Sequence, residues 1–322
     1  EGVGCGAAYV NNALSFDGSS YIDLLNTENV EPESISVSAW IKLFSINNEV
    51  QIVSKYDGTL GKAWNLCIQE SSQKPYFNFR HSSGGNRTVF ANTAVGLNEW
   101  YHITGTWDGE NLSIYLNGQL EASQNESDGS INNSSSRILI GAESQGNSGF
   151  IHGNVDEVYV WSIALNQEEI QSNMNQELIG NEEGLIGYWN FNEVQNSTAY
   201  DITGNGYDGT VYGAELSGDA APIDPPPAIY GCNDPYAENY DIYANTNDGT
   251  CEYSQEPVTF TKEDYADVSL EENQDRITAS VWITRGDNQP LYNAAFESYS
   301  DHGVSPSGTI WTSGQTALQT NT

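Results

Sequence analysis

The first two thirds of the sequence consist of short runs in which apolar and polar residues alternate, separated by turns rich in Gly, Asn and Asp. Successive side chains of a β-strand point to opposite faces of a sheet, so each run predicts a strand with one buried face. The clearest runs are 34–41, 100–107, 112–116, 137–141, 155–161, 184–191 and 209–213. Asn117-Gly118 directly after the third run is a strong hairpin signal. Many short strands with long loops predict an all-β, two-sheet antiparallel sandwich.

A single helix is predicted within this region. Asn166 is a good N-cap, and the following Gln167-Glu168-Glu169-Ile170 places acids near the positive end of a helix.

The charge of the chain excludes whole classes of partner. Lys and Arg number 10 against 44 Asp and Glu, giving a formal charge of −34. Such a surface repels phosphate, so nucleic acid and anionic lipid are not expected partners. No apolar run approaches the ~20 residues that span a bilayer, so no membrane insertion is expected. Because 38% of the residues are hydrophobic and only 17% charged, the chain should fold.

Composition shifts divide the chain. Residues 1–220 form the predicted sandwich, and the Pro-rich stretch 221–229 predicts a stiff linker. A small Cys-bounded unit follows at 230–254. Residues 255–322 contain a convincing strand at 277–284, and we expect a small β-module there, complete or cut short. The absence of a leader at Glu1 suggests a secretion signal removed or lying outside this sequence, which is expected to be a piece of a longer protein.

Cys5, Cys67, Cys232 and Cys251 show no metal-ligand spacing. The short polar loop between Cys232 and Cys251 favours a disulfide, worth about 3 kcal/mol in the chain-entropy model. Cys5 and Cys67 are candidates for a second disulfide that pins the first strand to the sandwich. Disulfides predict an extracellular protein; buried free thiols in a cytosolic protein are the alternative.

An ordered set of motifs carries a resemblance to a known family. The motifs are Ala13-Leu14-Ser15-Phe16-Asp17-Gly18, Val37-Ser38-Ala39-Trp40-Ile41, Trp100-Tyr101-His102-Ile103, Tyr115-Leu116-Asn117-Gly118, Gly153-Asn154-Val155-Asp156-Glu157-Val158 and Ala164-Leu165. Together they resemble the laminin-G-like, or concanavalin A-like, jelly-roll domains of secreted proteins. The resemblance covers roughly residues 1–220 and implies a jelly-roll fold. It does not by itself determine function.

The Cys-bounded unit has a resemblance of its own. Gly231-Cys232-Asn233-Asp234-Pro235 through Asn247-Asp248-Gly249-Thr250-Cys251 is similar to a small repeat of secreted surface proteins from marine and gliding bacteria. That resemblance implies a bacterial setting among adhesion and binding modules.

The jelly-roll resemblance also implies a calcium site. Its relatives often hold a structural or ligand-bridging Ca²⁺ at the positions of Asp17 and Asp156, with Asn154 as an amide contributor, and calcium prefers such oxygen ligands. Asp201 with Asn205 is a second candidate. The alternative is that Asp17 makes a turn and Asp156 accepts backbone hydrogen bonds.

A glycosidase mechanism is the enzyme hypothesis to test, because relatives of this sandwich hydrolyse β-glucans. It needs paired carboxylates, as an E-x-D-x-x-E strand would supply. Here Asn154 and Tyr159 occupy both glutamate positions, and the adjacent Asp156 and Glu157 are expected to point to opposite faces. No other catalytic motif is present. The chain is predicted not to be an enzyme.

Carbohydrate binding needs aromatic rings for pyranose faces and Asn, Asp or Gln for hydroxyls. The candidates are Tyr56, Asp57, Trp64, Tyr76, Asn78 and Asn147. Each is also an ordinary sandwich residue. The remaining tryptophans that we assign to the core are Trp40, Trp100, Trp107, Trp161 and Trp189.

The leading hypothesis is a non-catalytic secreted or cell-surface adhesion protein that binds a glycan or another surface ligand, assisted by calcium. The first alternative is a structural subunit of an extracellular fibre or stalk, with self-association by strand exchange through residues 1–10. The second is an accessory module of a larger secreted hydrolase or protease.

Overall fold

The computed structural model describes residues 11–252 and the backbone of two further strands, 276–284 and 290–299. Positions 58–60, 127–129, 144–145, 193, 233, 235–236, 242–243 and 245, and the side chain of Asp57, lie outside this description. The chain divides into two compact units, Glu1–Tyr230 with Tyr243–Thr246, and Gly231–Ile242 with Asn247–Thr322. The sandwich predicted from the sequence lies in the first unit.

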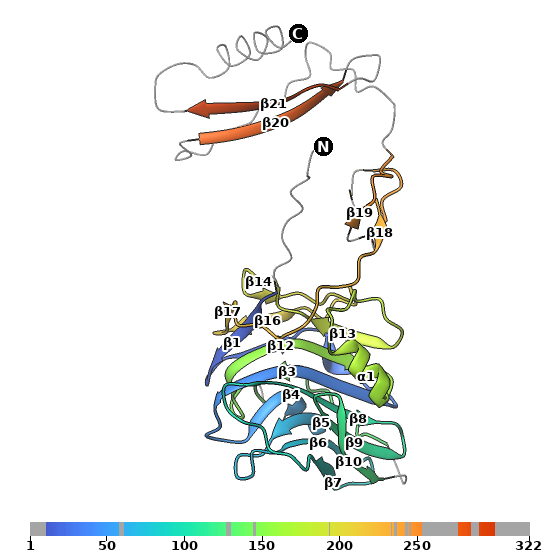
Figure 1. Ribbon diagram of the computed structural model, residues 1–322. Coiled ribbons are helices and arrows are strands. Elements are labelled where there is room, and N and C mark those ends of the chain that lie inside the picture. Colours follow the sequence, from blue (N-terminus) through green and yellow to red (C-terminus); the bar gives the residue numbers. More distant parts are fainter. Residues whose placement is uncertain are drawn as a thin grey trace. The chain divides into compact units, whose positions relative to one another are not determined.

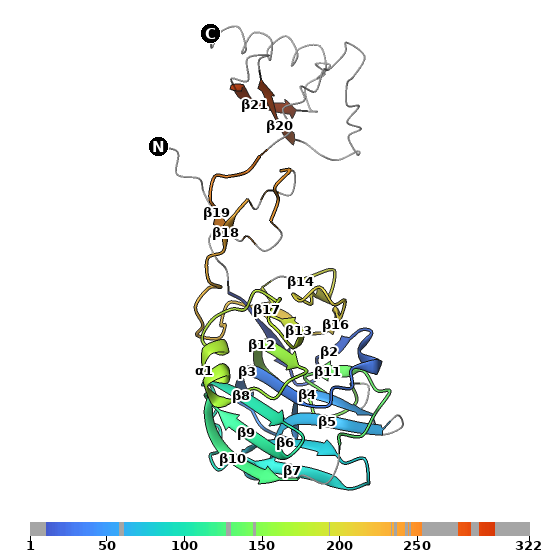
Figure 2. The same cartoon turned by 90° about the vertical axis from the view of Figure 1, so that its right-hand side faces the viewer.

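Two antiparallel sheets face each other in the first unit, which confirms the predicted sandwich (Figures 1 and 2). The eight-stranded sheet has the order β10 (Gln119–Asn125), β9 (Asn111–Leu116), β8 (Trp100–Trp107), β3 (Ile35–Ser45), β12 (His152–Trp161), β1 (Ala13–Asp17) and β17 (Glu215–Ser217), with β13 (Leu185–Trp189) also paired to β12. The predicted Asn117-Gly118 turn joins β9 to β10, and both residues have positive φ, 48° and 71°. That geometry matches the twist of a tight hairpin.

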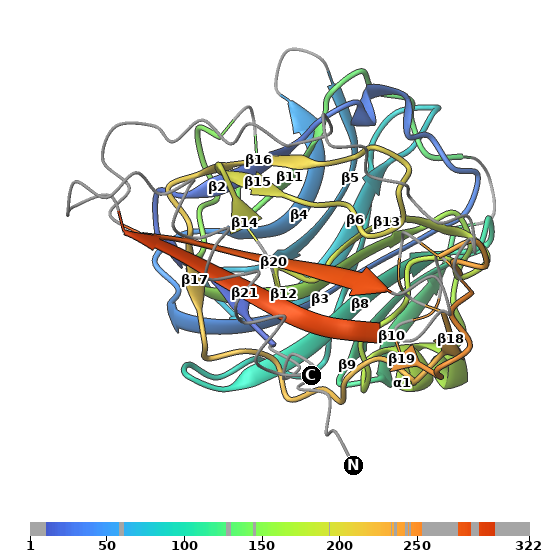
Figure 3. The same ribbon diagram turned by 90° about the horizontal axis from the view of Figure 1, so that it is seen from above.

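The nine-stranded sheet forms the other layer. Its order is β14 (Val194–Gln195), β15 (Thr198–Ala199), β16 (Gly209–Tyr212), β2 (Tyr21–Leu24), β11 (Ile138–Ile140), β4 (Val50–Asp57), β5 (Gly61–Ile68), β6 (Pro75–Arg80) and β7 (Asn86–Phe90). Figure 3 shows the strands of this layer from above. A short 3₁₀ turn, η1 (Thr27–Asn29), follows β2.

The core lies between the sheets, where the inward residues of each strand meet. Ile35, Val37, Ala39 and Ile41 of β3 are fully buried in it, as the alternation predicts. The layers approach closely at Gly105 of β8, where a Cβ atom would lie 2.2 Å from Phe77 Cγ of β6. A glycine there allows the Phe77 ring to fill the space between the layers.

The outer side of the eight-stranded sheet is covered by the helix α1 (Gln167–Asn173) and its flanking loops (Figure 1). Asn166 Oδ1 accepts hydrogen bonds from the backbone N–H groups of Glu168 and Glu169, and the Glu169 carboxylate accepts one from the Asn166 N–H. This capping box confirms the predicted start of the helix. Ile170 packs into a second apolar cluster on this side.

The second unit contains the Cys232–Cys251 disulfide. The short strands β18 (Tyr230–Gly231) and β19 (Thr246–Asn247) pair with each other. The strands β20 (Arg276–Thr284) and β21 (Pro290–Tyr299) pair antiparallel, and the predicted strand 277–284 lies within β20. Cys67 is a free, fully buried thiol, which does not support the expected bond to Cys5. Cys5 itself lies outside the described residues.

Lys55 of β4 is a fully buried ammonium group that ties three segments together. Its Nζ donates to the backbone oxygens of Thr27, Glu28 and Ser136 at 2.8, 2.9 and 2.6 Å. Burial lowers the pKa of Lys55 to about 8, and the carboxylates of Glu31 and Glu28 oppose that shift. The Thr27 oxygen also accepts from the Val30 N–H at 3.2 Å, so Lys55 adds a second donor there and links this turn to the Ser136 segment.

Replacing Lys55 by Met keeps the length of the side chain and removes its donors. We expect Lys55→Met to lower the free energy of unfolding by about 3 kcal/mol, because buried carbonyl groups lose their partner. Denaturant unfolding followed by tryptophan fluorescence measures this change. Lys74→Met in the β5–β6 turn is the control. Equal free energies of unfolding for the two variants would contradict a stabilising role of the Lys55 hydrogen bonds.

Candidate functional site

A polar row crosses the outer side of the nine-stranded sheet. Ser54, Asn65, Asn78 and Thr88 stand opposite one another on β4, β5, β6 and β7. Their strand neighbours, such as Phe77, face the core. Because side chains alternate along each strand, the polar residues point away from the core.

An adjacent row on the same side mixes polar and aromatic groups. It runs through Gln51, Cys67, Tyr76 and Phe90, which are register partners on the same four strands. Gln51 Oε1 accepts hydrogen bonds from Asn65 Nδ2 at 2.7 Å and from Cys67 Sγ at 2.8 Å. The Tyr76 and Phe90 rings lie 5.0 Å apart between centroids, and Phe90 is 37% exposed. The two rows place amide groups beside aromatic surface.

Two amide oxygens in these rows have no hydrogen-bond partner among the described residues. They are Asn65 Oδ1 and Asn78 Oδ1, each shielded from solvent. A buried acceptor without a donor costs about 1–3 kcal/mol. Two such oxygens side by side on paired strands mark a place where donor groups from another molecule would be stabilised.

We call the two rows, from Ser54 to Thr88 and from Gln51 to Phe90, the polar patch. Charged groups lie around it. Lys62 of β5 lies over the ring of Tyr56, with Nζ 5.4 Å from the centroid. Burial lowers the pKa of Lys62, while the carboxylates of Glu143 and Glu49 oppose the shift. Burial also raises the pKa of Glu143. Glu49 accepts a hydrogen bond of 2.5 Å from the Tyr76 hydroxyl. A cation, two carboxylates and a phenol therefore border the unpartnered amides.

The structure brings some of the predicted ligand-binding residues together. Tyr76 and Asn78 lie in the two rows, and Tyr56 lies against Lys62 beside them. Asn147 is exposed in the loop before Gly149, whose backbone oxygen accepts a hydrogen bond from the Gln51 N–H at 2.8 Å. The side chain of Asp57 lies outside the described residues.

Two tryptophans lie where the sequence did not predict them. Trp64, expected at a binding surface, is fully buried in the core because it occupies an inward position of β5. Trp100, expected in the core, is only half-buried, and its Nε1 donates to Asp219 Oδ1 at 3.3 Å. Because side chains alternate along a strand, the face that a tryptophan occupies depends on where the strand begins. The sequence alone does not define the first residue of either strand.

The residues predicted to bind calcium are used in separate hydrogen-bond networks. Asp17 Oδ1 accepts from the Ser19 N–H and from the hydroxyls of Ser19 and Ser20, which lowers the pKa of Asp17 to about 2. Asn154 Nδ2 donates to the backbone oxygen of Asp219 at 3.0 Å. Asp17 thus forms the turn that the alternative interpretation predicts.

The other three predicted calcium ligands also make hydrogen bonds within the chain. Asp156 is fully buried and accepts from the backbone N–H groups of Glu157 and Ala221. Asp201 accepts from three backbone N–H groups, including that of Tyr188, and Asn205 donates to the Ile186 oxygen. In the part of the chain that the structure describes, no group of three or more His, Cys, Asp or Glu is placed to hold a metal ion. Each residue of the two predicted calcium sites thus makes hydrogen bonds within the chain.

Asp156 and Glu157 do not point to opposite faces, which corrects the sequence-based expectation. Glu157 has a φ of 50°, and the register of β12 against β3 shifts between Asp156 and Tyr159. This bulge turns both carboxyl groups to the outer side, where each interacts electrostatically with Glu177. Periodicity alone does not reveal a bulge.

Both acids are sealed from solvent. Glu157 Oε2 accepts from the hydroxyls of Tyr159 and Tyr188, whose rings stack 4.8 Å apart. Burial raises the pKa of Asp156 to about 8. Burial, and then the neighbouring Asp156, raises the pKa of Glu157 well above its usual value. Neither acid borders an open groove.

Among the described residues, no helix is long and apolar enough to cross a membrane.

Comparison with known families agrees with this geometry. Residues 16–171 match a laminin G family model described as the concanavalin A-like lectin/glucanases superfamily. Residues 16–171 form a concanavalin A-like domain. The polar patch lies inside the matched range, which ends within α1, whereas Asp201 and Ala221 lie beyond it although they belong to the same compact unit.

Relatives with curated descriptions match the same part of the chain. Pentraxin-related protein PTX3 of Mus musculus is 28% identical over 174 residues, covering 51% of this chain and 44% of that protein. The human protein of the same name is 27% identical over the same length. The chain thus spans less than half the length of these relatives.

A solved structure shows the same fold as the concanavalin A-like domain. A protein from Bacteroides ovatus, proposed to bind carbohydrate, is similar with a TM-score of 0.54 and 20% identity. The similarity covers 66% of this chain and 61% of that one. At this identity it supports the fold.

The buried acids of the concanavalin A-like domain predict a stability that falls as pH rises. The folded chain keeps protons on Asp156 and Glu157 at pH values where the unfolded chain has lost them, so rising pH favours unfolding. Glu157→Gln removes one of these groups while keeping its size. We expect this variant to lose less stability than the wild type between pH 5 and 9, by a difference on the order of 2 kcal/mol.

Denaturant unfolding at the two pH values measures the difference. Glu168→Gln, an exposed position in α1, is the control and should follow the wild type. Parallel pH dependence of wild type and Glu157→Gln would contradict the assignment of a raised pKa to Glu157.

Proposed function

We propose that the outer side of β4, β5, β6 and β7 binds carbohydrate and that the domain is not catalytic. The observation that carries this proposal is the pair of unpartnered, buried amide oxygens on Asn65 and Asn78. Sugar hydroxyls are donors, and two neighbouring hydroxyls suit two neighbouring acceptors.

The groups around the amides suit the rest of a sugar. Lys62 donates to ring or hydroxyl oxygens, and Glu49 and Glu143 accept from further hydroxyls. The adjoining Tyr76 and Phe90 rings supply apolar surface for a pyranose face. Because both amide oxygens are shielded from solvent, binding requires a local movement of the side chains that cover them.

Two observations favour binding over cleavage. The superfamily description covers both lectins and glucanases, so the family match alone does not decide. Hydrolysis of a glycosidic bond needs two carboxyl groups that face the substrate, and Asp156 and Glu157 are fully buried. The carbohydrate-binding proposal for the Bacteroides ovatus protein of the same fold supports the same choice.

The setting we propose is extracellular, at a cell surface. The Cys232–Cys251 disulfide supports this placement, because such bonds persist in oxidising compartments. A protein that binds glycans at a cell surface acts in adhesion. The alternative of fibre formation through residues 1–10 concerns residues that the structure does not describe, and it stays a prediction that size-exclusion chromatography at several concentrations tests.

A glycan array tests the proposal directly. We expect Asn78→Ala to weaken glycan binding about 10- to 100-fold, because the sugar loses a buried acceptor. The same change should leave the melting temperature nearly unchanged, since the acceptor has no partner within the chain. Asn125→Ala on the edge strand β10 is the control. Failure of the wild type to retain any glycan would reject the proposal.

Calcium dependence needs a test of its own. Because the five residues predicted to bind calcium are used in other hydrogen bonds, we expect EDTA to leave the melting temperature of the protein unchanged. Differential scanning calorimetry with 1 mM-scale calcium and with EDTA measures this. A drop in melting temperature with EDTA would restore the calcium-assisted hypothesis and point to ligands other than these five.

A further inference from the structure

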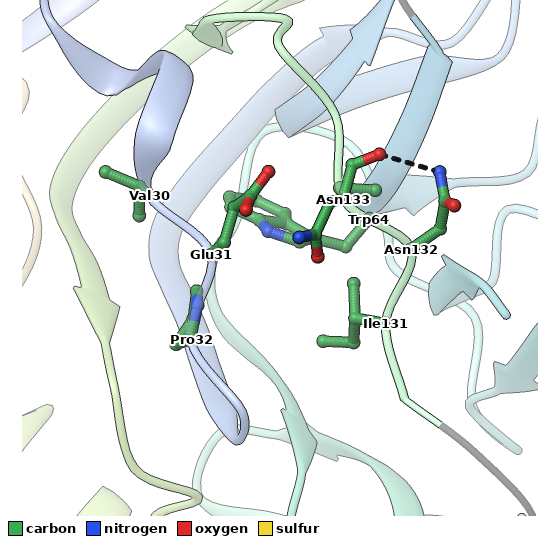
Figure 4. A pocket seen from close by; sticks show the side chains of 8 residues that line it. Val30, Glu31, Pro32, Trp64, Ile131, Asn132 and Asn133 are labelled. Atoms are coloured by element: carbon green, nitrogen blue, oxygen red, sulfur yellow. Dashed lines mark hydrogen bonds between the residues drawn. The ribbon is translucent and has the colours of Figure 1, made fainter. Parts of the chain in front are cut away.

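The pocket shown in Figure 4 is too small to hold a sugar. Its cavity volume is about 10 Å³, which is room for about one water molecule, and the Trp64 side chain that lines it is fully buried. Three segments surround it, the loop after η1, the start of β5 and the loop before β11. A larger ligand has to bind to an exposed surface, and the outer side of the nine-stranded sheet offers one apart from the polar patch.

A pair of stacked tyrosines lies on this side at the other end of the sheet. Tyr21 of β2 and Tyr212 of β16 are register partners, and their ring centroids lie 4.6 Å apart with the planes 14° from parallel. Their strand neighbours Ile22 and Val211 belong to the core, so both rings point to the outer side. Tyr212 is 45% exposed. The tyrosine pair therefore presents a flat aromatic surface to solvent.

The loop after β11 supports the tyrosine pair from the other side. β11 pairs with β2 on the edge opposite β16, and Gly146 of this loop lies so close to Tyr21 that a Cβ atom would be 2.4 Å from its Cε1 and Cζ atoms. The φ of Gly146, 77°, also favours glycine. The loop packs against Tyr21 and Tyr21 packs against Tyr212, so the exposed ring is held in place before a ligand binds. Such a ring loses little conformational freedom on binding.

The turn between β14 and β15 brings polar groups to the edge of the tyrosine pair. The Val211 N–H donates to the Ser197 backbone oxygen at 2.8 Å, next to Tyr212 in the chain. Continuing the register of β15 against β16 places Asn196 opposite Tyr212. The side chains of Asn196 and Ser197 are exposed. An amide and a hydroxyl both donate and accept, as sugar hydroxyls do.

This turn carries a serine where its backbone favours glycine. Asn196 and Ser197 have φ values of 51° and 61°, the left-handed conformation that a two-residue hairpin of type I′ needs at both positions. Asn adopts this conformation more readily than Ser, and Gly adopts it without steric cost. The Ser197 hydroxyl is therefore retained against the conformational preference of the backbone. Strain of this kind at an exposed position is a reason to ask what the side chain binds.

The size and the charge of this surface favour a small neutral ligand. Because a tyrosine has about 150–250 Å² of surface, the exposed part of Tyr212 amounts to roughly 100 Å². A stable protein complex buries about 800 Å² on each partner, which is far more than this ring offers. β15, β16 and the turn carry no charged side chain, and the chain as a whole has a charge of −34, which repels anions. One face of an uncharged pyranose ring fits both properties.

We propose that the tyrosine pair is a second carbohydrate-binding site, at which a neutral pyranose stacks on Tyr212 and its hydroxyls bond to the side chains of Asn196 and Ser197. Tyr21 and the loop at Gly146 hold the stacking ring in position. The inference rests on the proposed function, because it extends glycan binding from the polar patch to a second place on the same side of the sheet. Sialylated and sulfated sugars are expected to bind more weakly than neutral ones, since the negative charge of the chain repels them.

Titration of the full chain with methyl pyranosides of glucose, galactose, mannose and N-acetylglucosamine, followed by ligand-observed NMR, tests this inference. We expect at least one pyranoside to bind, and Tyr212→Ala to weaken its binding about tenfold because the stacking surface is lost. Tyr212→Phe keeps the ring and should bind within about threefold of the wild type. Tyr240→Ala, which removes a ring of similar exposure (42%) in the second unit, is the matched control.

Ser197→Gly separates a binding role from a structural one. Glycine suits the left-handed φ of this position, so the variant should melt at a higher temperature than the wild type. It should nevertheless bind the pyranoside several-fold more weakly, because a hydroxyl is lost from the site. A variant that is more stable and binds as the wild type does would contradict the assigned role of Ser197.

The variant Asn78→Ala distinguishes this site from the polar patch. The tyrosine pair is intact in Asn78→Ala, so pyranoside binding that depends on Tyr212 should persist there. Loss of all binding in Asn78→Ala, with none lost in Tyr212→Ala, overturns the inference and leaves the proposed function in place. The opposite result rejects the polar patch and supports the tyrosine pair. If no pyranoside binds to the wild type, the inference is wrong, and the glycan array then decides the proposed function separately.

Discussion

The packing of the two sheets against each other is the interaction on which the rest of the molecule depends. Burial of the inward residues supplies the main favourable free energy, because it removes a large apolar area from water. Because Gly105 has no side chain, the Phe77 ring of one layer packs directly against the backbone of the other, which sets the spacing of the two layers there. With the inward positions committed to the core, only the outward positions and the rims remain for function.

The two outer sides have different roles because different segments lie on them. On the eight-stranded sheet, the cluster around α1 and the segment around Ala221 shield Asp156 and Glu157 from solvent. The nine-stranded sheet carries amides, a lysine and aromatic rings on its outer side. This asymmetry underlies the proposal of binding without cleavage.

The candidate site was only partly predictable. Tyr76 and Asn78 were recognisable as an aromatic residue and an amide in one alternating run. Asn65 became a candidate only when the register placed it opposite Asn78, and Lys62 only when its ammonium was seen over Tyr56. Trp64 was predicted at a binding surface, but it is fully buried in the core. Residue type is visible in a sequence, whereas convergence of distant strands is not.

The sequence by itself determined the all-β class, the run of strands, the capped helix and the Asn117-Gly118 hairpin, because alternation, capping and turn chemistry are local properties. Only the tertiary structure decided the positive φ of Glu157, the burial of Lys55 among three carbonyl groups and the separate hydrogen-bond networks of the predicted calcium ligands. Each of these depends on segments that lie far apart in the chain and meet through sheet register. No short stretch of the sequence predicts side-chain surroundings of that kind.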